Sequence, residues 1–194
     1  MSEYAVLRDD RLAGSLPGSF TRWWHDLNVI GMDSTTRLRT AFRRLNALRR
    51  EHGKLHTIFV LCHGFAGASE NLQMSGDFGG QGLQLGFETV LHSNVSMWSE
   101  VRDVASNMVI YACAASNTEA GNGFTKEDGR YLMGALAIHT NSFVYAGDRI
   151  QWYNPANFDF GTWEGQLFKF PPSGQEPTPV TRPPVEFRQL ISVI

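Results

Sequence analysis

Two short stretches of the sequence end an apolar run in a residue that can take part in nucleophilic chemistry. Residues 108–113, MVIYAC, end at Cys113, and residues 57–64, TIFVLCHG, end at His63 and Gly64. A thiolate attacks carbonyl carbons, and a nearby imidazole raises the thiolate content and later delivers the proton to the leaving group. The two stretches together predict a Cys–His dyad for acyl transfer.

Small residues beside the predicted dyad leave space for a substrate. Gly64 places a backbone N–H beside His63 with no side chain in the way, and the Cys113 amide lies at the thiol itself. Two such amides can form an oxyanion hole, which holds the negatively charged oxygen of a tetrahedral intermediate. Ala112 adds no bulk before the cysteine, so a substrate backbone has room there.

The elements that must position these residues are strands of a parallel sheet. Three apolar runs predict buried strands, at 57–62, 107–112 and 142–146. Amphipathic stretches predict helices at 34–53, 96–105 and 126–139, with Asp33 or Ser34 capping the first. This alternation predicts an α/β domain with a mostly parallel sheet. Ligands gather at the carboxyl ends of such strands, so Cys113 and His63 reach the same edge if their strands are neighbours.

The remaining segments are expected to be irregular. Glycines and a proline break any period in residues 1–33, and the glycine-rich stretch 76–82, GDFGGQG, predicts a mobile loop over the site. Residues 171–184 are rich in proline and predict an extended strap that joins neither a helix nor a central strand, while 185–194 are apolar enough to dock back as a strand or short helix.

Composition favours one domain spanning residues 1–194, because this length supports a single α/β core and is short for two. The net charge of −2 gives no electrostatic argument for nucleic acid or an anionic membrane surface. No run reaches the length of a spanning helix and no signal peptide is visible, so the sequence predicts a cytoplasmic protein.

The two cysteines are too few for a disulfide framework and are expected to be free thiols, with Cys62 packed in the core. Cys62 and His63 are adjacent and point oppositely along a strand, and His52 and His56 flank the helix break at Gly53. Such spacing does not match a zinc site, and no dinucleotide or phosphate-loop motif is present. We therefore expect neither a metal nor a cofactor.

The arrangement of these blocks resembles the caspase-like (clan CD) cysteine peptidases, and is most similar to bacterial caspase-like domains. The resemblance covers residues 57–153 and rests on His-Gly after one apolar block, Ala-Cys after the next, and the later blocks DGRYLMGALA and VYAGDRIQWY. It implies a three-layer α/β/α sandwich with a mostly parallel central sheet. It also implies that Cys113 and His63 form the dyad of a cysteine endopeptidase, with Gly64 as an oxyanion donor.

The chain departs from this family at the residue that sets specificity. Caspases carry glutamine two positions before the cysteine and metacaspases an acidic residue, whereas this chain has Tyr111. Specificity for an aspartate or a basic side chain is therefore not inherited. Asp148 can line the pocket and favour a basic side chain, or instead pair with Arg149 or cap a turn. Trp152 can form an apolar pocket wall, or simply cover the surface.

Three functions fit this set of residues. The first is a cysteine endopeptidase that forms a thioester on Cys113 and acts on a peptide or protein substrate. The second is a catalytically inactive caspase-like domain that binds a protein or peptide in the same groove. The third is another acyl transfer, such as deamidation or transglutamination, which uses similar Cys–His chemistry. The sequence predicts neither the substrate nor the oligomeric state.

Overall fold

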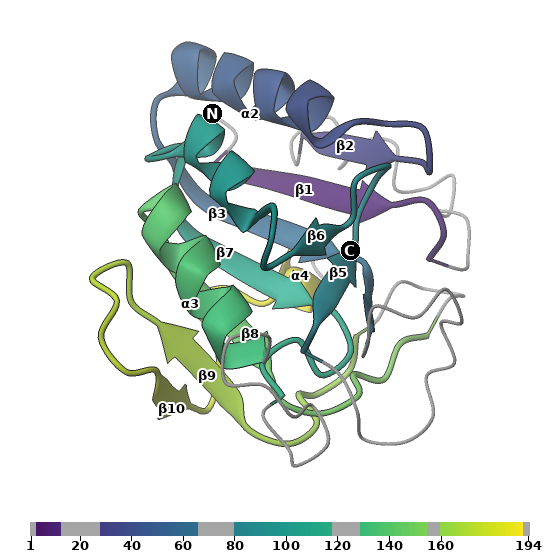
Figure 1. The fold of residues 1–194 in the computed structure, drawn as a ribbon, viewed down its shortest axis with the longest axis vertical. Helices are drawn as coiled ribbons and strands as arrows, with labels where there is room; N and C mark the ends of the chain where they lie inside the picture. The colour runs from purple at the N-terminus through teal and green to yellow at the C-terminus, as the bar shows by residue number, and fades with distance from the viewer. Residues whose placement is uncertain (1–2, 13–27, 66–79, 118–128, 155–159, 192–194) are drawn as a thin grey trace.

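The computed structural model describes residues 3–12, 28–65, 80–117, 129–154 and 160–191 of the 194-residue chain (Figure 1). The described strands are β1 Tyr4–Asp9, β2 Val29–Met32, β3 Leu55–Leu61, β4 His63–Phe65, β5 Gly82–Gln84, β6 Val90–Leu91, β7 Ala105–Tyr111, β8 Phe143–Gly147, β9 Leu167–Phe170 and β10 Thr178–Val180. The described helices are α2 Leu38–His52, the 3-10 helix η2 Val95–Val101, α3 Gly129–Thr140 and α4 Phe187–Ile191.

Seven of these strands form one sheet in the order β10-β9-β8-β7-β3-β1-β2. The five strands from β2 to β8 run parallel, and β9 and β10 are each antiparallel to their neighbour. The protein is therefore an α/β fold with a mostly parallel central sheet, as the sequence predicts. The chain goes from β1 to β2 on one side and returns to β3 on the other, so the strand order reverses between β1 and β3.

Two apolar clusters cover the two faces of the sheet. The larger joins alternate residues of the parallel strands, such as Ile58 and Ile110, to buried side chains of α2, η2 and α3. The smaller joins the intervening residues, such as Phe59 and Tyr111, to Phe187 of α4. Figure 1 looks onto the face that carries η2 and α3, and α4 lies behind the sheet. Because a cluster covers each face of the sheet, the parallel strands are buried on both sides, which explains why their sequences are continuously apolar.

The helix α2 forms where the sequence predicts one, but it begins at Leu38 and its expected caps are wrong. Its N-cap residue Arg37 makes no side-chain capping bond. The Leu38 amide instead donates to the Glu88 carboxylate at 2.8 Å. Asp33 cannot cap the helix because its carboxylate accepts hydrogen bonds from the amides and hydroxyls of Thr35 and Thr36.

The expectation that residues 1–33 are irregular is wrong for the described part of that segment. Residues 4–9 form β1, which lies between β2 and β3, and residues 29–32 form β2 at the edge. Ala5, Val6 and Leu7 are fully buried, so a run of only three apolar residues provides the centre of a strand. Residues 13–27 lie outside the described part of the chain.

The proline-rich tail also contributes to the sheet. Residues 178–180 form β10, an edge strand with Pro179 at its centre, and Phe187–Ile191 form the short helix α4. A proline cannot donate to a sheet ladder, which is why this strand is tolerated only at an edge. The sequence therefore correctly predicts that residues 171–184 form no central strand, but it does not predict the edge strand β10.

The three strands predicted from apolar runs are confirmed as β3, β7 and β8 with bounds shifted by up to two residues. The helix predicted at 96–105 is a shorter 3-10 helix, because Ala105 already belongs to β7. Residues 76–79 of the glycine-rich stretch 76–82 lie outside the described residues, so the expected mobile loop falls mostly there. Gly82, which is described, begins β5 of a small antiparallel sheet formed by β4, β5 and β6. None of the described helices has the length and apolarity that crossing a membrane requires.

Candidate functional site at the carboxyl edge of the sheet

The strands that precede His63 and Cys113 are hydrogen-bonded neighbours. β3 and β7 pair in parallel, with Leu61 opposite Tyr111 at their carboxyl ends. The pairing extends one step further, since the Cys62 amide donates to the Tyr111 carbonyl at 3.1 Å. His63 and Cys113 therefore leave the sheet side by side at one edge, as the sequence predicts for neighbouring strands.

Gly64 lies directly against the backbone of Cys113. A methyl group on Gly64 would overlap the Cys113 carbonyl oxygen and would lie 3.2 Å from its backbone nitrogen. Both partners are main-chain atoms, so no flexible side chain could move aside. Glycine is required here by close approach of two backbones. The contact sets the backbone of Gly64 against the backbone of Cys113, the two residues whose amides the sequence predicts as oxyanion donors.

The Cys113 thiol is part-buried and weakly held. Its Sγ atom lies 3.9 Å from the Gln151 carbonyl oxygen. Burial raises the pKa of the Cys113 thiol, and the nearby Glu164 carboxylate raises it further. At neutral pH the resting thiol is therefore protonated, and a base must remove its proton before it can act as a nucleophile.

The backbone directly after the thiol is strained. Ala114 has a φ of +46°, a left-handed conformation that costs a residue with a side chain roughly 1 kcal/mol or more. Its amide donates to the Arg149 carbonyl at 2.8 Å, and the Ser116 amide donates to the Gly147 carbonyl at 3.0 Å. These bonds hold the loop after β7 against the loop after β8. Strain of this kind is concentrated at functional sites.

His63 is the first residue of β4 and is half-buried. β4 pairs with β5, and His63 lies opposite Gln84. Neither ring nitrogen has a hydrogen-bond partner among the residues that the structure describes. Cys113 and His63 are thus adjacent in the fold without a hydrogen bond between them in this resting state. Catalytic hydrogen bonds are commonly long or absent before a substrate binds.

Two of the residues predicted to bind substrate are packed in the core. Tyr111 is 4% exposed, its ring stacks on Trp163 with centroids 4.7 Å apart, and its hydroxyl accepts a hydrogen bond from the Phe187 amide at 3.1 Å. Ala112 is 2% exposed and belongs to the cluster on the opposite face of the sheet. Both side chains contribute to packing at this edge.

Asp148 follows β8, which is the neighbour of β7 as expected. Its carboxylate accepts a hydrogen bond from the Gln166 amide at 2.8 Å, and its carbonyl accepts one from the Asn117 side chain at 2.9 Å. Asp148 therefore stabilises the turn that leads to β9. This is the turn-capping role that the sequence also allows for it.

Trp152 is 53% exposed and lies one residue after Gln151, whose carbonyl contacts the thiol. Its amide donates to the Glu164 carboxylate at 3.0 Å. The Gln151 side chain fixes the same loop by donating to the carbonyls of Arg149 and Glu164. Sequence reasoning did not identify Gln151 or Glu164, because both lie in loops without a local pattern.

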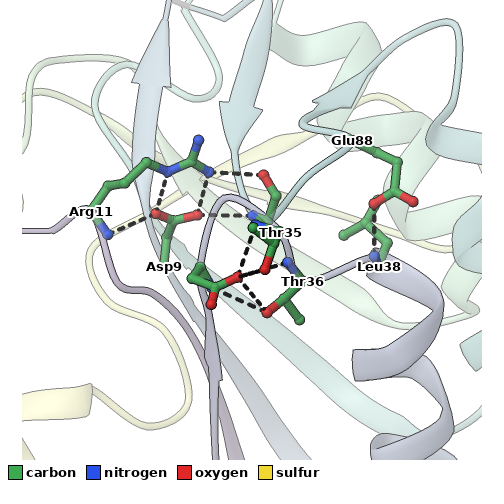
Figure 2. A network of polar contacts seen from close by, with 8 residues as sticks. Asp9, Arg11, Thr35, Thr36, Leu38 and Glu88 are labelled. Atoms are coloured by element: carbon green, nitrogen blue, oxygen red, sulfur yellow. Dashed lines mark hydrogen bonds and ion pairs between the residues drawn. The ribbon is translucent and has the colours of Figure 1, made fainter.

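A second polar group missed by sequence reasoning lies at the carboxyl end of β1. The Asp9 carboxylate is fully buried and pairs with Arg11 through two bonds, Nε to Oδ1 at 2.7 Å and Nη2 to Oδ2 at 2.6 Å (Figure 2). This pair raises the pKa of the Arg11 guanidinium, which remains charged. Both partners also bond to Gly86, because its amide donates to Asp9 and its carbonyl accepts from Arg11, each at 2.9 Å.

The Asp9–Arg11 pair connects the central sheet to the small sheet that carries His63. Gly86 follows β5, and β5 pairs with β4. Gly86 has a φ of +67°, and a side chain there would overlap the Thr36 carbonyl, so the turn fits only glycine. The neighbouring turn is also tightly bonded, since the Thr35 and Thr36 hydroxyls lower the pKa of Asp33 to about 2 (Figure 2). These contacts fix the position of β4, and with it His63.

The part of the chain that the structure describes contains no group of three His, Cys, Asp or Glu side chains able to hold a metal ion. Cys62 is buried, and burial raises its thiol pKa well above the ordinary value, as expected for a core residue. No model of a known protein family matches the chain, and a search of curated proteins finds no match either. The function must therefore be argued from this edge of the sheet.

Proposed function

We propose that this chain is a cysteine endopeptidase of the caspase-like type, with Cys113 as nucleophile and His63 as general acid and base. The observation that carries the proposal is the contact between Gly64 and Cys113 at the ends of two neighbouring parallel strands. This contact supports a site in which the Cys113 thiol, the His63 imidazole and the amides of Gly64 and Cys113 act on one substrate carbonyl. The proposal includes the three-layer α/β/α sandwich of this family, which the apolar clusters on both sheet faces support.

The proposed reaction proceeds in two steps. His63 removes the Cys113 proton as the sulfur attacks the substrate carbonyl carbon, and the amides of Gly64 and Cys113 stabilise the resulting oxyanion. The peptide C–N bond then breaks, the amine leaves with the proton from His63, and a thioester remains on Cys113. Water, deprotonated by His63, attacks the thioester carbon, which releases a carboxylic acid and restores the thiol.

The loop after β8 supports a location for the side chain that precedes the scissile bond. Trp152 offers an exposed aromatic wall, and Glu164 places a carboxylate close enough to the thiol to raise its pKa. Asp148 has one carboxylate oxygen bonded to the backbone. A carboxylate at this position favours a basic side chain, which makes lysine or arginine the expected residue before the cleaved bond.

A second function, a catalytically inactive domain that binds a peptide at the same edge, is favoured by a different observation. The resting thiol has a raised pKa and no hydrogen bond to His63 among the described residues. An unreactive thiol is what a binding domain would retain. The two functions predict the same groove and differ only in whether a bound peptide is cut.

The test is cleavage of a peptide library followed by mass spectrometry. The wild-type chain should cut after basic residues, Cys113→Ala should abolish cutting, and His63→Ala should reduce it by at least about a hundredfold. His92→Ala is the matched control, because His92 is exposed and lies outside the site. Alkylation by iodoacetamide should modify Cys113 and leave buried Cys62 unmodified. Binding of a peptide without any cleavage by the wild-type chain would favour the second function.

A further inference from the structure

A cavity of about 520 Å³ lies away from Cys113, at the β9–β10 end of the sheet. It is lined by Tyr145, Lys169, Val180, Arg182, Pro183, Pro184 and Gln189. Tyr145 of β8 and Lys169 of β9 are direct cross-strand partners, and their side chains share a sheet face. No lining residue belongs to the candidate site. The volume falls in the range of roughly 300–1,000 Å³ that is typical of small-molecule sites.

The hydroxyl of Tyr145 is the first feature that points to a ligand. Tyr145 is 6% exposed as a whole and lines the cavity, and among the described residues its hydroxyl is not one of the buried side-chain oxygen or nitrogen atoms that lack a hydrogen-bond partner. The ring of Tyr145 is therefore packed in the sheet while its hydroxyl is accessible from the cavity, where it can form a hydrogen bond with a bound molecule. Burial also raises the pKa of this phenol, so it remains protonated and can donate a hydrogen bond. A ligand in the cavity that carries a hydrogen-bond acceptor can take this bond in place of water.

The charge of the cavity is the second feature. Lys169 and Arg182 both line it, and no acidic residue does. The Lys169 ammonium lies 4.0 Å from the centroid of the Phe143 ring, a contact that leaves its positive charge unneutralised. Glu186, the acidic residue nearest in sequence to Arg182, does not line the cavity, and its carboxylate is paired with Arg188 at 2.7 Å. Two cations in a concave site attract an anion.

We infer that this cavity binds the oxyanion of a small, partly apolar molecule. The anionic group, a phosphate ester or a carboxylate, accepts hydrogen bonds from Tyr145 and pairs with Lys169 and Arg182. The apolar part contacts the prolines and Val180, which line the same cavity. A planar guanidinium, as on Arg182, suits either oxyanion because it can donate two parallel hydrogen bonds.

The test uses phenyl phosphate, benzoate and phenol as probes and isothermal titration calorimetry as the measurement. Phenyl phosphate or benzoate should bind saturably, and phenol should bind at least about tenfold more weakly because it lacks the anion. Comparison of the two anions identifies which oxyanion the cavity prefers. Peptide cleavage is not used as a readout, so the result is independent of the proposed function.

Variants assign the binding to the cavity. Arg182→Gln should weaken binding of the preferred anion by about tenfold, and Tyr145→Phe, which removes one oxygen atom, by about fivefold. Arg43→Gln on α2 is the matched control, because Arg43 is equally exposed and lies outside the cavity; it should change binding less than about twofold. Circular dichroism verifies that each variant is folded.

The inference is overturned by any of three results. The first is no saturable binding of either anion up to about 10 mM, a concentration well above that of a specific small-molecule site. The second is equal weakening by Arg182→Gln and Arg43→Gln, which would indicate a general effect of surface charge. The third is unchanged binding in Tyr145→Phe, which would show that the Tyr145 hydroxyl does not contact the ligand.

Discussion

The carboxyl ends of β1 and β7 lie at the same edge of one sheet and differ in how their polar groups are bonded. At the end of β1, the Asp9 carboxylate is fully buried and bonded to Arg11 and Gly86. At the end of β7, the Cys113 thiol lies 3.9 Å from the Gln151 carbonyl oxygen, and Ala114 is held in a left-handed conformation. The first end therefore carries a charged pair in short hydrogen bonds, and the second carries a long thiol contact beside a strained residue. Functional sites commonly show this division.

Gly64→Ala should have the largest effect, because it acts directly on the β7 end. The new methyl group would overlap the Cys113 carbonyl, so the two backbones must separate. If the Gly64 amide stabilises the oxyanion, peptidase activity should fall by about a hundredfold or more. Steady-state kinetics on the best library peptide measures this fall.

Gly134→Ala is the matched control for this variant. An added methyl group at Gly134 on α3 would have no atom within 4 Å, so the change should keep activity and stabilise the protein by up to about 1 kcal/mol. Full activity in Gly64→Ala would show that close approach of the two backbones is not needed for the reaction.

Arg11→Met tests the β1 end. It leaves the buried Asp9 carboxylate without its cation, and we expect the free energy of unfolding to fall by about 3 kcal/mol. Urea denaturation measures the change. Arg8→Met is the comparison, because Arg8 pairs with the half-exposed Asp10 and should contribute less. A loss below about 0.5 kcal/mol in Arg11→Met would mean that this network does not hold the sheet edge.

The pH dependence of Cys113 alkylation sharpens the comparison further. A raised thiol pKa means that thiolate forms only at higher pH, so the rate of alkylation should rise about tenfold per pH unit from 6.5 and should not level off by pH 9. In denaturant the rate should level off at the ordinary thiol pKa of about 8.5. A plateau near pH 7 in the folded protein would instead indicate a preformed ion pair with His63.

Ala114→Gly should have the smallest effect. Glycine adopts a positive φ without strain, so the folded state should gain up to about 1 kcal/mol, reduced by the greater freedom of glycine in the unfolded chain. Thermal denaturation measures the gain. A stabilised variant with lower activity would show that the left-handed conformation helps to position Cys113, and a destabilised variant would contradict the assignment of strain to this residue.

The sequence predicts β3, β7 and β8, because each is a short, continuous apolar run of the length of a buried strand. It also predicts the sheet edge at which these strands end. It does not predict β1, because only three apolar residues lie between Tyr4 and the polar residues Arg8 and Asp9. It predicts the adjacency of Cys113 and His63 because parallel strands end on the same side. This prediction needs only the order of the strands.

The rest of the site depends on contacts between residues far apart in the chain. Arg11 and Gly86 are separated by 75 positions, and Cys113 and Gln151 by 38. Neither pair has a local sequence signal, because each contact is set by how a loop folds over the sheet edge. The assignment of Tyr111 to substrate binding relied on its position relative to Cys113, whereas its ring lies in the core beside Trp163.

The proline at the centre of β10 has a consequence for association between copies of this protein. An open sheet edge invites another strand because it presents a row of amide donors. β10 is only three residues long and exposed Pro179 offers no such donor. A strand from a second molecule would find a gap in the middle of its hydrogen-bonding ladder. This margin of the sheet is therefore protected against edge-to-edge aggregation even though its backbone is open to solvent.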